Sequence, residues 1–309
     1  MSGERTAEQE AHVPSAGDSY LDLPDNAALE ARIEVAIEPW LKHMAWRADF
    51  AQWRDRRIRQ EDHQTTNLQD VRSALRHDLA DKVVLDLGAG MGGLSVALLR
   101  DFGTEGLRLL AMDYNPDYCR IARLRGDRYG IRLPIAVAAG EHLPYASSAF
   151  DLVICLDVLE HVAHAPSVLR EMHRVLRPGG IVLTTVPNRH AFRDPHYHLP
   201  LINWLPRTLA EWIIERAGRS KVNALLHDRQ GLSELNTYTW GQFERLAKSL
   251  GYNVQDQVYE RIRHGEIRLL TGVRKRLLAV LSHTHLLRLL YRAYRYGWQG
   301  TFQITLVKG

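Results

Sequence analysis

Residues 86–93 read Asp-Leu-Gly-Ala-Gly-Met-Gly-Gly and connect a short apolar stretch at 83–85 to a helical pattern at 94–99. A glycine-rich turn between a strand and a helix lets the backbone approach a ligand closely, and the amides at the start of the helix face an anion. We therefore predict that this turn binds a ligand.

The glycines of this turn fit two spacings. Gly88, Gly90 and Gly93 satisfy the dinucleotide pattern G-x-G-x-x-G. Asp86 with Gly88, Gly90 and Gly92 satisfies D-x-G-x-G-x-G. The spacing alone leaves both interpretations open, because the physical requirement for a close backbone approach is the same in each.

Apolar and helical patterns alternate along the rest of the chain. We expect strands at residues 83–85, 107–112, 135–138, 152–156, 181–186, 252–260 and 302–307. Helical patterns lie between them, including 116–129, 168–175 and 239–251. This alternation predicts an α/β fold with a parallel sheet covered by helices on both faces. Ligands bind beyond the carboxyl ends of such strands, so Asp113, which closes the second strand, is placed to accept hydrogen bonds from a ribose diol.

The chain divides into regions of different character. Residues 1–25 mix glycine, proline, serine and acidic residues without periodicity, which indicates a mobile N-terminal arm. Helical patterning over 26–80 predicts a helical extension, and residues 81–309 contain the predicted sheet. Two insertions interrupt this core: 188–236, which we interpret as a lid, and 261–297, which we interpret as basic helices.

The composition is that of an ordinary globular chain, with 45% hydrophobic and 25% charged residues among 309. Two cysteines are too few for a disulfide framework, which suits a reducing compartment. The first residues offer no apolar core for a signal peptide, and no segment approaches the roughly 18 to 20 apolar residues of a membrane span. We expect a cytoplasmic protein that could be peripheral at the inner face of a membrane.

Positive charge is concentrated near the C-terminus. The net charge of the whole chain is +4, but residues 1–30 carry −6 and residues 261–297 carry +8. Apolar residues recur at helical spacing over 270–281, which predicts a basic amphipathic helix. Such a helix could lie on an anionic membrane surface, present arginines to phosphates, or form a solvated face over a packed one.

Four segments carry a resemblance to a known family. They are 85–92 (LDLGAGMG), 109–116 (LLAMDYNP), 140–162 (GEHLPYASSAFDLVICLDVLEHV) and 176–188 (LRPGGIVLTTVPN). In these segments the chain resembles the class I S-adenosylmethionine-dependent methyltransferases of the ubiquinone-biosynthesis type. The resemblance implies a Rossmann-like, doubly wound, mostly parallel seven-stranded sheet whose last strand is antiparallel, with the helical extension and the two insertions forming a lid.

The resemblance also implies S-adenosylmethionine as the cofactor. Gly88, Gly90 and Gly92 would pass under its methionine moiety, Asp86 would lie near the amino group, and Asp113 would hold the ribose hydroxyls. The other positions that match the family's cofactor site are Tyr114, Gly140, Glu141, His142, Leu143 and Asp157.

One position departs from the family's pattern. Related sequences commonly have a carboxylate for the adenine amino group where this chain has Ala139. Glu141 or a backbone carbonyl must therefore replace it.

Methyl transfer is a direct displacement at a sulfonium carbon, so the enzyme has to hold the nucleophile in line in a dry pocket. A hydroxyl nucleophile also needs a base. Asp157, Glu160 and His161 would share one face of a helical turn after the fourth strand. His161 could then act as the base, or the three could hold a divalent metal, which resembles the arrangement in some quinone-biosynthesis O-methyltransferases. Alternatively, these side chains only orient loops.

The expected lid supplies a second group of histidines: His190, His196 and His198. Nearby prolines and aromatic residues indicate that the lid is ordered. In an extended chain His196 and His198 would share one face, so both could reach one substrate as a base or a hydrogen-bond donor.

The resemblance implies a methyltransferase, and we expect a small-molecule or lipid- or sugar-linked acceptor, with O-methylation favoured over N- or C-methylation. The arginine-rich insertion favours an anionic or amphiphilic acceptor. A nucleic-acid methyltransferase is an alternative that the isoelectric point near 9.1 permits, but the chain lacks an Asn-Pro-Pro-Tyr type of motif for an extruded base. A non-catalytic, membrane-associated module that keeps the donor site only as structure is the third interpretation.

Overall fold

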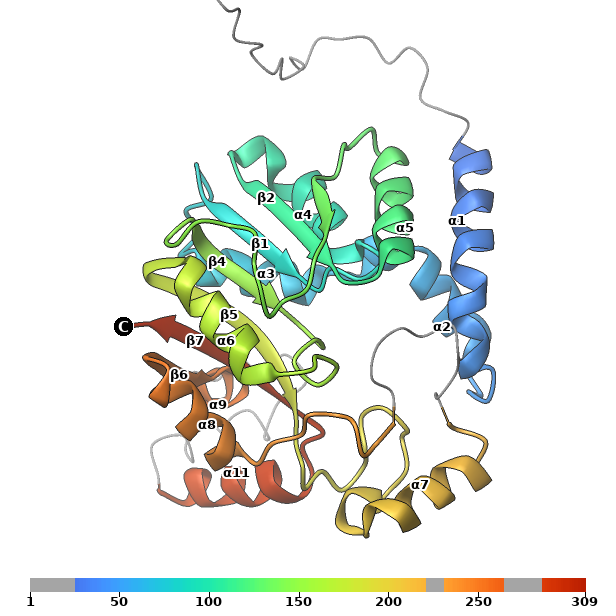
Figure 1. The fold of residues 1–309 in the computed structure, drawn as a ribbon, viewed down its shortest axis with the longest axis vertical. Coiled ribbons are helices and arrows are strands. Elements are labelled where there is room, and N and C mark those ends of the chain that lie inside the picture. The colour runs from blue at the N-terminus through green and yellow to red at the C-terminus, as the bar shows by residue number, and fades with distance from the viewer. Residues whose placement is uncertain (1–25, 221–230, 264–284) are drawn as a thin grey trace, which may run out of the picture.

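The computed structural model describes residues 26–220, 231–263 and 285–309 (Figure 1). The arm expected at 1–25 and the basic helix expected over 270–281 lie outside the described residues.

The described chain forms a seven-stranded sheet in the order β3-β2-β1-β4-β5-β7-β6. The strands are β1 (Val83–Leu87), β2 (Arg108–Asp113), β3 (Ile135–Val137), β4 (Phe150–Cys155), β5 (Leu176–Pro187), β6 (Tyr252–Asp256) and β7 (Thr301–Lys308). Strands β1 to β5 are parallel, whereas β7 runs antiparallel to both β5 and β6. The predicted fold class, including its antiparallel last strand, is confirmed.

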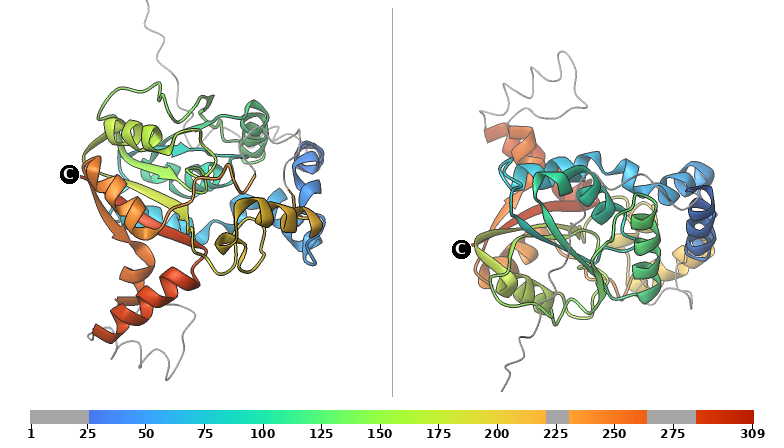
Figure 2. Two further views of the ribbon diagram at one scale, coloured as in Figure 1. Left: turned by 60° about the horizontal axis from the view of Figure 1, so that its bottom comes forward. Right: turned by 90° about the horizontal axis from the view of Figure 1, so that it is seen from above.

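Helices cover both faces of the sheet (Figures 1 and 2). On one face, α6 (Ala165–Val175) and α8 (Trp240–Ser249) pack against strand side chains such as Val153. On the other, α3 (Thr65–Ala74), α4 (Gly93–Phe102) and α5 (Pro116–Asp127) pack against side chains such as Leu152. Successive residues of β4 thus enter opposite cores, which is why this strand is almost wholly apolar.

Two helix starts follow the capping signals in the sequence. The Asn115 side chain accepts a hydrogen bond from the amide of Asp117 at 2.9 Å, and Pro116 occupies the first position of α5. Thr239 and Gln242 form a reciprocal capping box at the start of α8. These side chains satisfy amides that a helix leaves unpaired at its first turn.

One strand is shorter than expected. The apolar pattern predicted a strand over 252–260, but β6 ends at Asp256 and α9 (Gln257–Arg263) follows. Oδ1 of Asp256 accepts hydrogen bonds from the amides of Val258 and Tyr259 at 3.0 and 3.1 Å. An aspartate cap of this kind starts a helix in spite of the β-forming residues that follow it.

The N-terminal extension is helical, as predicted, and packs against α5. It contains α1 (Asn26–Leu41), η1 (Lys42–Met44), α2 (Phe50–Ile58), η2 (Gln60–His63) and α3. Glu61 is fully buried and pairs with Arg125 at 2.5 Å and Arg128 at 2.7 Å. The boundaries of the predicted domains and insertions remain interpretations.

The remaining helices are η3 (Gly103–Glu105), η4 (Ile202–Trp204), α7 (Arg207–Arg216) and α11 (His285–Gly297). Among the described residues, no helix combines the length and the apolar character needed to cross a membrane.

Candidate functional site

Two neighbouring cavities open where β1, β2 and β4 end. Their volumes are about 610 Å³ and about 390 Å³. Gly88, Gly90, Tyr118, Asp157 and His161 line both of them, so the glycine turn lies at their boundary. The carboxyl edge of the sheet, where the strand pattern predicts a ligand site, therefore contains cavities.

The glycine turn has a conformation that side chains would disturb. Gly88, Gly90 and Gly92 have φ angles of 73°, 55° and 79°. A Cβ atom at Gly88 would overlap Val158, and one at Gly92 would lie 2.5 Å from Cβ of Ala122. A Cβ at Gly90 would meet no described atom within 4 Å and would instead take up open space beside the cavities. Gly88 and Gly92 are thus needed for close packing, whereas Gly90 keeps space open for a ligand.

Asp86 lines the larger cavity although its side chain is buried. Burial raises the pKa of Asp86 to about 6, and the negative charge of Asp113 adds to this effect. The Ser95 hydroxyl opposes it by donating a hydrogen bond of 2.5 Å to Oδ2 of Asp86. A ligand that brings a positive group to this carboxylate would restore its charge at lower pH.

Asp113 holds the glycine turn in place and faces the smaller cavity. Its carboxylate accepts hydrogen bonds from the amides of Gly90 and Asn115, both at 2.8 Å. It also lines the smaller cavity, and its binding of ribose hydroxyls stays a prediction.

The smaller cavity is formed by the ends of β2 and β3 and by the turn after β4. Tyr114, Ala139, Gly140 and Glu141 line it. Oε1 of Glu141 accepts hydrogen bonds from the amides of residues 163 and 164, at 3.1 and 3.3 Å. This carboxylate therefore also orders the turn after β4.

His142 and Leu143, which the resemblance also assigns to the cofactor site, are not among the described lining residues of either cavity. Leu143 is buried in the core, and its amide donates to Glu171 at 2.8 Å.

Asp157 lies between the two cavities. Its φ angle is 55°, and its Oδ1 accepts a hydrogen bond of 2.9 Å from the Thr185 hydroxyl. Asp157 is accessible from the cavities. The surrounding protein nevertheless limits the hydration of its carboxylate, which raises its pKa, and the negative charge of Glu160 raises this pKa further.

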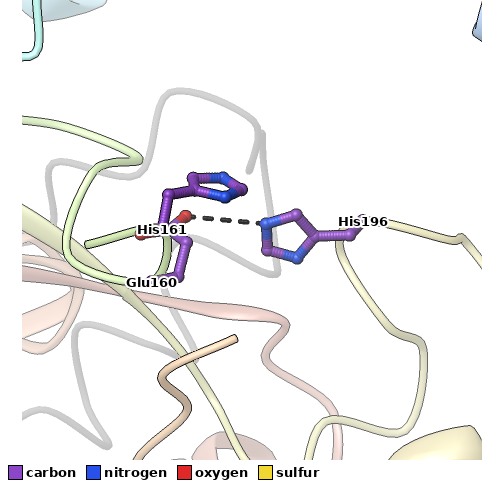
Figure 3. Close-up of side chains that lie close together, drawn as sticks. All are labelled: Glu160, His161 and His196. Atoms are coloured by element: carbon purple, nitrogen blue, oxygen red, sulfur yellow. Dashed lines mark ion pairs between the residues drawn. The ribbon is translucent and has the colours of Figure 1, made fainter. Parts of the chain in front are cut away.

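Three side chains from two distant segments of the chain meet near the end of β4 (Figure 3). Glu160 and His161 come from the turn after β4, and His196 comes from the lid segment. Nε2 of His196 lies 3.6 Å from Oε1 of Glu160, and the two imidazole rings are 5.5 Å apart at 80°. Glu160 is only 2% exposed, and its Oε2 atom has no hydrogen-bond partner among the described residues.

Hydrogen bonds from the lid hold this group together. The side-chain amide of Asn236 donates to the carbonyls of Leu159 and Val162 at 3.0 and 2.8 Å, which fixes the turn that carries Glu160 and His161. Oδ1 of Asp194 accepts the amide of His196 at 2.8 Å and orients the lid segment.

The group differs from the expected set of Asp157, Glu160 and His161. One potential ligand atom each from Glu160, His161 and His196 lies within 4.8 Å of the others, and Asp157 is not part of this group. Residues 157–161 form an irregular turn rather than a helical one, which directs Asp157 toward Thr185. A carboxylate and two imidazoles are suitable ligands for a divalent metal.

His198 does not join His196. The expected extended segment is instead a turn, and the φ angle of His198 is 54°. Its Nε2 lies 3.4 Å from Nη1 of Arg47, and its ring is 6.0 Å from that of Trp46. The prediction that His196 and His198 share one face is therefore wrong. His190 packs against Trp204 instead, with ring centres 5.6 Å apart.

The N-terminal helices, which the sequence predicts to form part of the lid, supply one wall of the larger cavity through residues that the sequence patterns did not single out. They contribute Trp40, Leu41, Met44, Trp53, Arg57, Gln60, Gln64, Asn67, Asp70 and Val71 to the larger cavity. Gln60, Gln64 and Asn67 recur at helical spacing, which was the available signal for a polar face. Burial lowers the pKa of Arg57, whose Nε has no hydrogen-bond partner among the described residues.

Residues 85–184 match the family model described as a methyltransferase domain. A ubiquinone biosynthesis O-methyltransferase from Xanthomonas oryzae pv. oryzae (strain PXO99A) is 35% identical over 115 residues, 37% of this chain and 46% of that protein. A ubiquinone/menaquinone biosynthesis C-methyltransferase from Cupriavidus pinatubonensis is 35% identical over 100 residues, 32% of this chain and 41% of that protein. The chain carries a class I S-adenosylmethionine-dependent methyltransferase domain.

The methyltransferase domain match ends within β5, before the lid and β7. The chain spans less than half the length of these two relatives. Among solved structures, a geranyl diphosphate C-methyltransferase from Streptomyces coelicolor A3(2) is similar with a TM-score of 0.46 and 15% identity, covering 79% of this chain and 74% of that one.

Proposed function

We propose that this chain transfers a methyl group from S-adenosylmethionine to a hydroxyl of a small-molecule acceptor. The observation that carries this proposal is the convergence of Glu160, His161 and His196 beside the glycine turn. A hydroxyl must lose its proton as it is methylated, and imidazoles ionise in the range that suits a general base.

The residues of the two cavities fit the cofactor. Gly90 leaves open space where any side chain would intrude, and the adjacent Asp86 offers a buried carboxylate to a cationic amino group. Asp113 and Tyr114 face the smaller cavity, which suits a ribose and an adenine. S-Adenosylmethionine bound here would supply the reactive methyl group on its sulfonium.

In this proposal the side chains after β4 and in the lid handle the acceptor proton. His161 lines both cavities and accepts the proton, while the buried carboxylate of Glu160 stabilises the imidazolium that forms. His196 closes the group from the lid side and helps exclude water from the acceptor.

The same three side chains could instead hold a divalent metal, which would supply a Lewis acid to the acceptor hydroxyl. Dialysis of the protein against a chelator separates the two versions. Activity that survives complete metal removal supports the histidine base, and loss with recovery on adding Mg²⁺ or Zn²⁺ supports the metal.

An anionic or amphiphilic acceptor is favoured by Arg57. Arg57 lines the larger cavity, and its Nε atom is buried without a hydrogen-bond partner among the described residues, which is costly unless a ligand supplies an acceptor. Arg57→Gln should weaken binding of the donor or the acceptor about tenfold, because a charge-assisted hydrogen bond is lost. Arg56→Gln is the matched control, since Arg56 is exposed next to it.

The experiment is a two-step one. Calorimetry should show S-adenosylmethionine binding in the micromolar range or tighter, with no comparable binding of NADH. Formation of S-adenosylhomocysteine is then measured with phenols, sugar nucleotides, lipid-linked intermediates, amines and nucleic acids as acceptors.

Methylation of a hydroxyl supports the proposal. Turnover only with an amine, a carbon acceptor or a nucleic acid would replace it. Absence of donor binding would indicate a non-catalytic module.

A further inference from the structure

Helix α11 turns two polar side chains toward the sheet. Tyr291 and Arg295 are buried, and both bind Asp256 at the end of β6. The guanidinium of Arg295 also lies over the Trp240 ring, 3.7 Å from its centre. The backbone carbonyl of Arg295 accepts a hydrogen bond of 2.7 Å from Asn188 at the base of the lid. These polar contacts fix the rotation of the helix.

The opposite side of α11 is apolar and faces outward. Leu286, Leu289, Leu290 and Tyr294 recur at helical spacing and are 52%, 62%, 53% and 48% exposed. Figures 1 and 2 show α11 at the periphery of the described protein. Leucines are normally the buried residues of an amphipathic helix, so this inverted arrangement needs an apolar environment outside the described chain.

The surroundings of this stripe indicate what that environment is. Arg288 and Arg292 are exposed on the flank of the stripe, and residues 285–297 contain no acidic residue. Tyr296 and Trp298 follow at 41% and 64% exposure, and such rings favour the boundary between lipid and water. An apolar stripe flanked by arginines and aromatic rings complements an anionic bilayer, with its negative surface and apolar interior.

The stripe is connected to the proposed acceptor site. The ring of Trp298 stacks on Phe192 of the lid segment, with centres 4.8 Å apart and planes at 3°. In the same segment Leu201 and Trp204 are 51% and 59% exposed. The residue that follows α11 thus contacts the segment that carries His196, and that segment exposes apolar side chains of its own.

We propose that the outward face of α11, made by Leu286, Leu289, Leu290 and Tyr294 and flanked by Arg288 and Arg292, docks on an anionic lipid bilayer. This inference goes beyond methyl transfer and does not depend on it. The helix lies in the interface plane, with the leucines among the acyl chains and the arginines at the headgroup phosphates.

Flotation of the full-length protein with lipid vesicles tests this. We expect binding to phosphatidylcholine vesicles that contain about one third phosphatidylglycerol at low salt, and little binding to pure phosphatidylcholine or at about 0.5 M salt. Leu286→Ser with Leu289→Ser and Leu290→Ser should reduce partitioning by at least about tenfold. Arg288→Gln with Arg292→Gln should also reduce it about tenfold, and only at low salt.

Matched controls are available on the N-terminal helices and α5. Val35 on α1 is 71% exposed and Arg120 on α5 is 66% exposed. Val35→Ser and Arg120→Gln should leave partitioning unchanged. All variants should keep their thermal melting points within a few degrees, because exposed side chains contribute little to stability.

If the triple leucine variant does not fold, a labelling experiment on a single position still tests whether α11 inserts into lipid. Both native cysteines, Cys119 and Cys155, are buried, so a polarity-sensitive dye can be attached selectively to Leu290→Cys. Its emission should shift to the blue with anionic vesicles, whereas the dye on Val35→Cys should not respond.

Absence of vesicle binding at low salt, or equal binding by the leucine variant, would overturn the proposal. A concentration-dependent dimer that the leucine variant disrupts, without vesicle binding, would also overturn it and assign the face to a second copy of the chain.

Discussion

The two halves of the candidate site are built in different ways. The donor half consists of strand ends and the turns that directly follow them: 86–93 at the end of β1, 113–115 at the end of β2 and 138–141 after β3. The acceptor half joins the N-terminal helices, the turn after β4, the lid and the start of β7. The donor half therefore depends on local backbone geometry, whereas the acceptor half depends on long-range packing.

This difference has a consequence for function. A turn between a strand and a helix keeps its shape while the rest of the molecule varies, so it suits a constant donor. Walls assembled from extensions and insertions can vary independently, which suits a specific acceptor. The methyltransferase family match, 85–184, covers the first part, but of the second it leaves out the N-terminal helices, the lid and β7.

The largest expected effect tests whether the lid contributes chemistry to the acceptor half. His161→Ala should lower turnover by about 100-fold or more, the usual contribution of a general base, with donor affinity unchanged within about twofold. His196→Ala should also lower turnover. His198→Ala is the control, because His198 contacts Arg47 outside the group, and it should have little effect. Equal losses in all three variants would mean that the lid is only structural.

The next prediction tests whether donor binding is local. Gly90→Asp should weaken S-adenosylmethionine binding by about 100-fold in calorimetry, because the side chain would occupy the open space beside both cavities. Gly179→Asp is a matched control: Gly179 also has a positive φ angle, 72°, and a Cβ there would likewise meet no described atom within 4 Å. Both variants should lose similar stability. Equal loss of binding would contradict a local donor site.

A third prediction concerns the stability that the protein loses by burying the Asp86 carboxylate in the donor half. The pKa of Asp86 is raised to about 6 in the folded chain from an ordinary value of 3.8. Its contribution to stability is therefore fully present below pH 3.8 and is lost as the pH rises through about 6. At pH 7.5, Asp86→Asn should be more stable than the unsubstituted chain by about 3 kcal/mol, and the gain should shrink toward pH 4.

Thermal melts across this pH range provide the measurement for Asp86. Ser95→Ala serves as a control, since it removes the hydrogen bond that lowers the pKa of Asp86. It should move the transition to higher pH. A stability difference independent of pH would show that Asp86 does not titrate as described.

The smallest effect concerns the departure from the family at Ala139. Ala139→Asp would place a carboxylate at the smaller cavity, where the family commonly has one. One added hydrogen bond to adenine should strengthen donor binding about threefold. Free methionine is the control ligand: its affinity should not change, because it has no adenine. Weaker binding of S-adenosylmethionine by the variant would mean that adenine does not occupy the smaller cavity.

Local signals in the sequence accounted for much of the fold. The apolar strand patterns, the cap at Asn115 and the capping box at Thr239 all predicted elements that the structure contains. The glycine turn was also recognisable, because its positive φ angles require glycine wherever the turn occurs. The strand predicted past Asp256 failed because a single side-chain cap outweighed a weak β pattern.

Sequence alone thus determined the order of elements and the donor turn, since both depend on interactions between residues close in the chain. Only the tertiary structure decided that His196, rather than His198 or Asp157, meets Glu160 and His161. It also decided that α11 exposes Leu286, Leu289 and Leu290, because periodicity defines two faces of a helix without saying which one is buried. Both outcomes depend on contacts between segments far apart in the chain, which residue spacing does not encode.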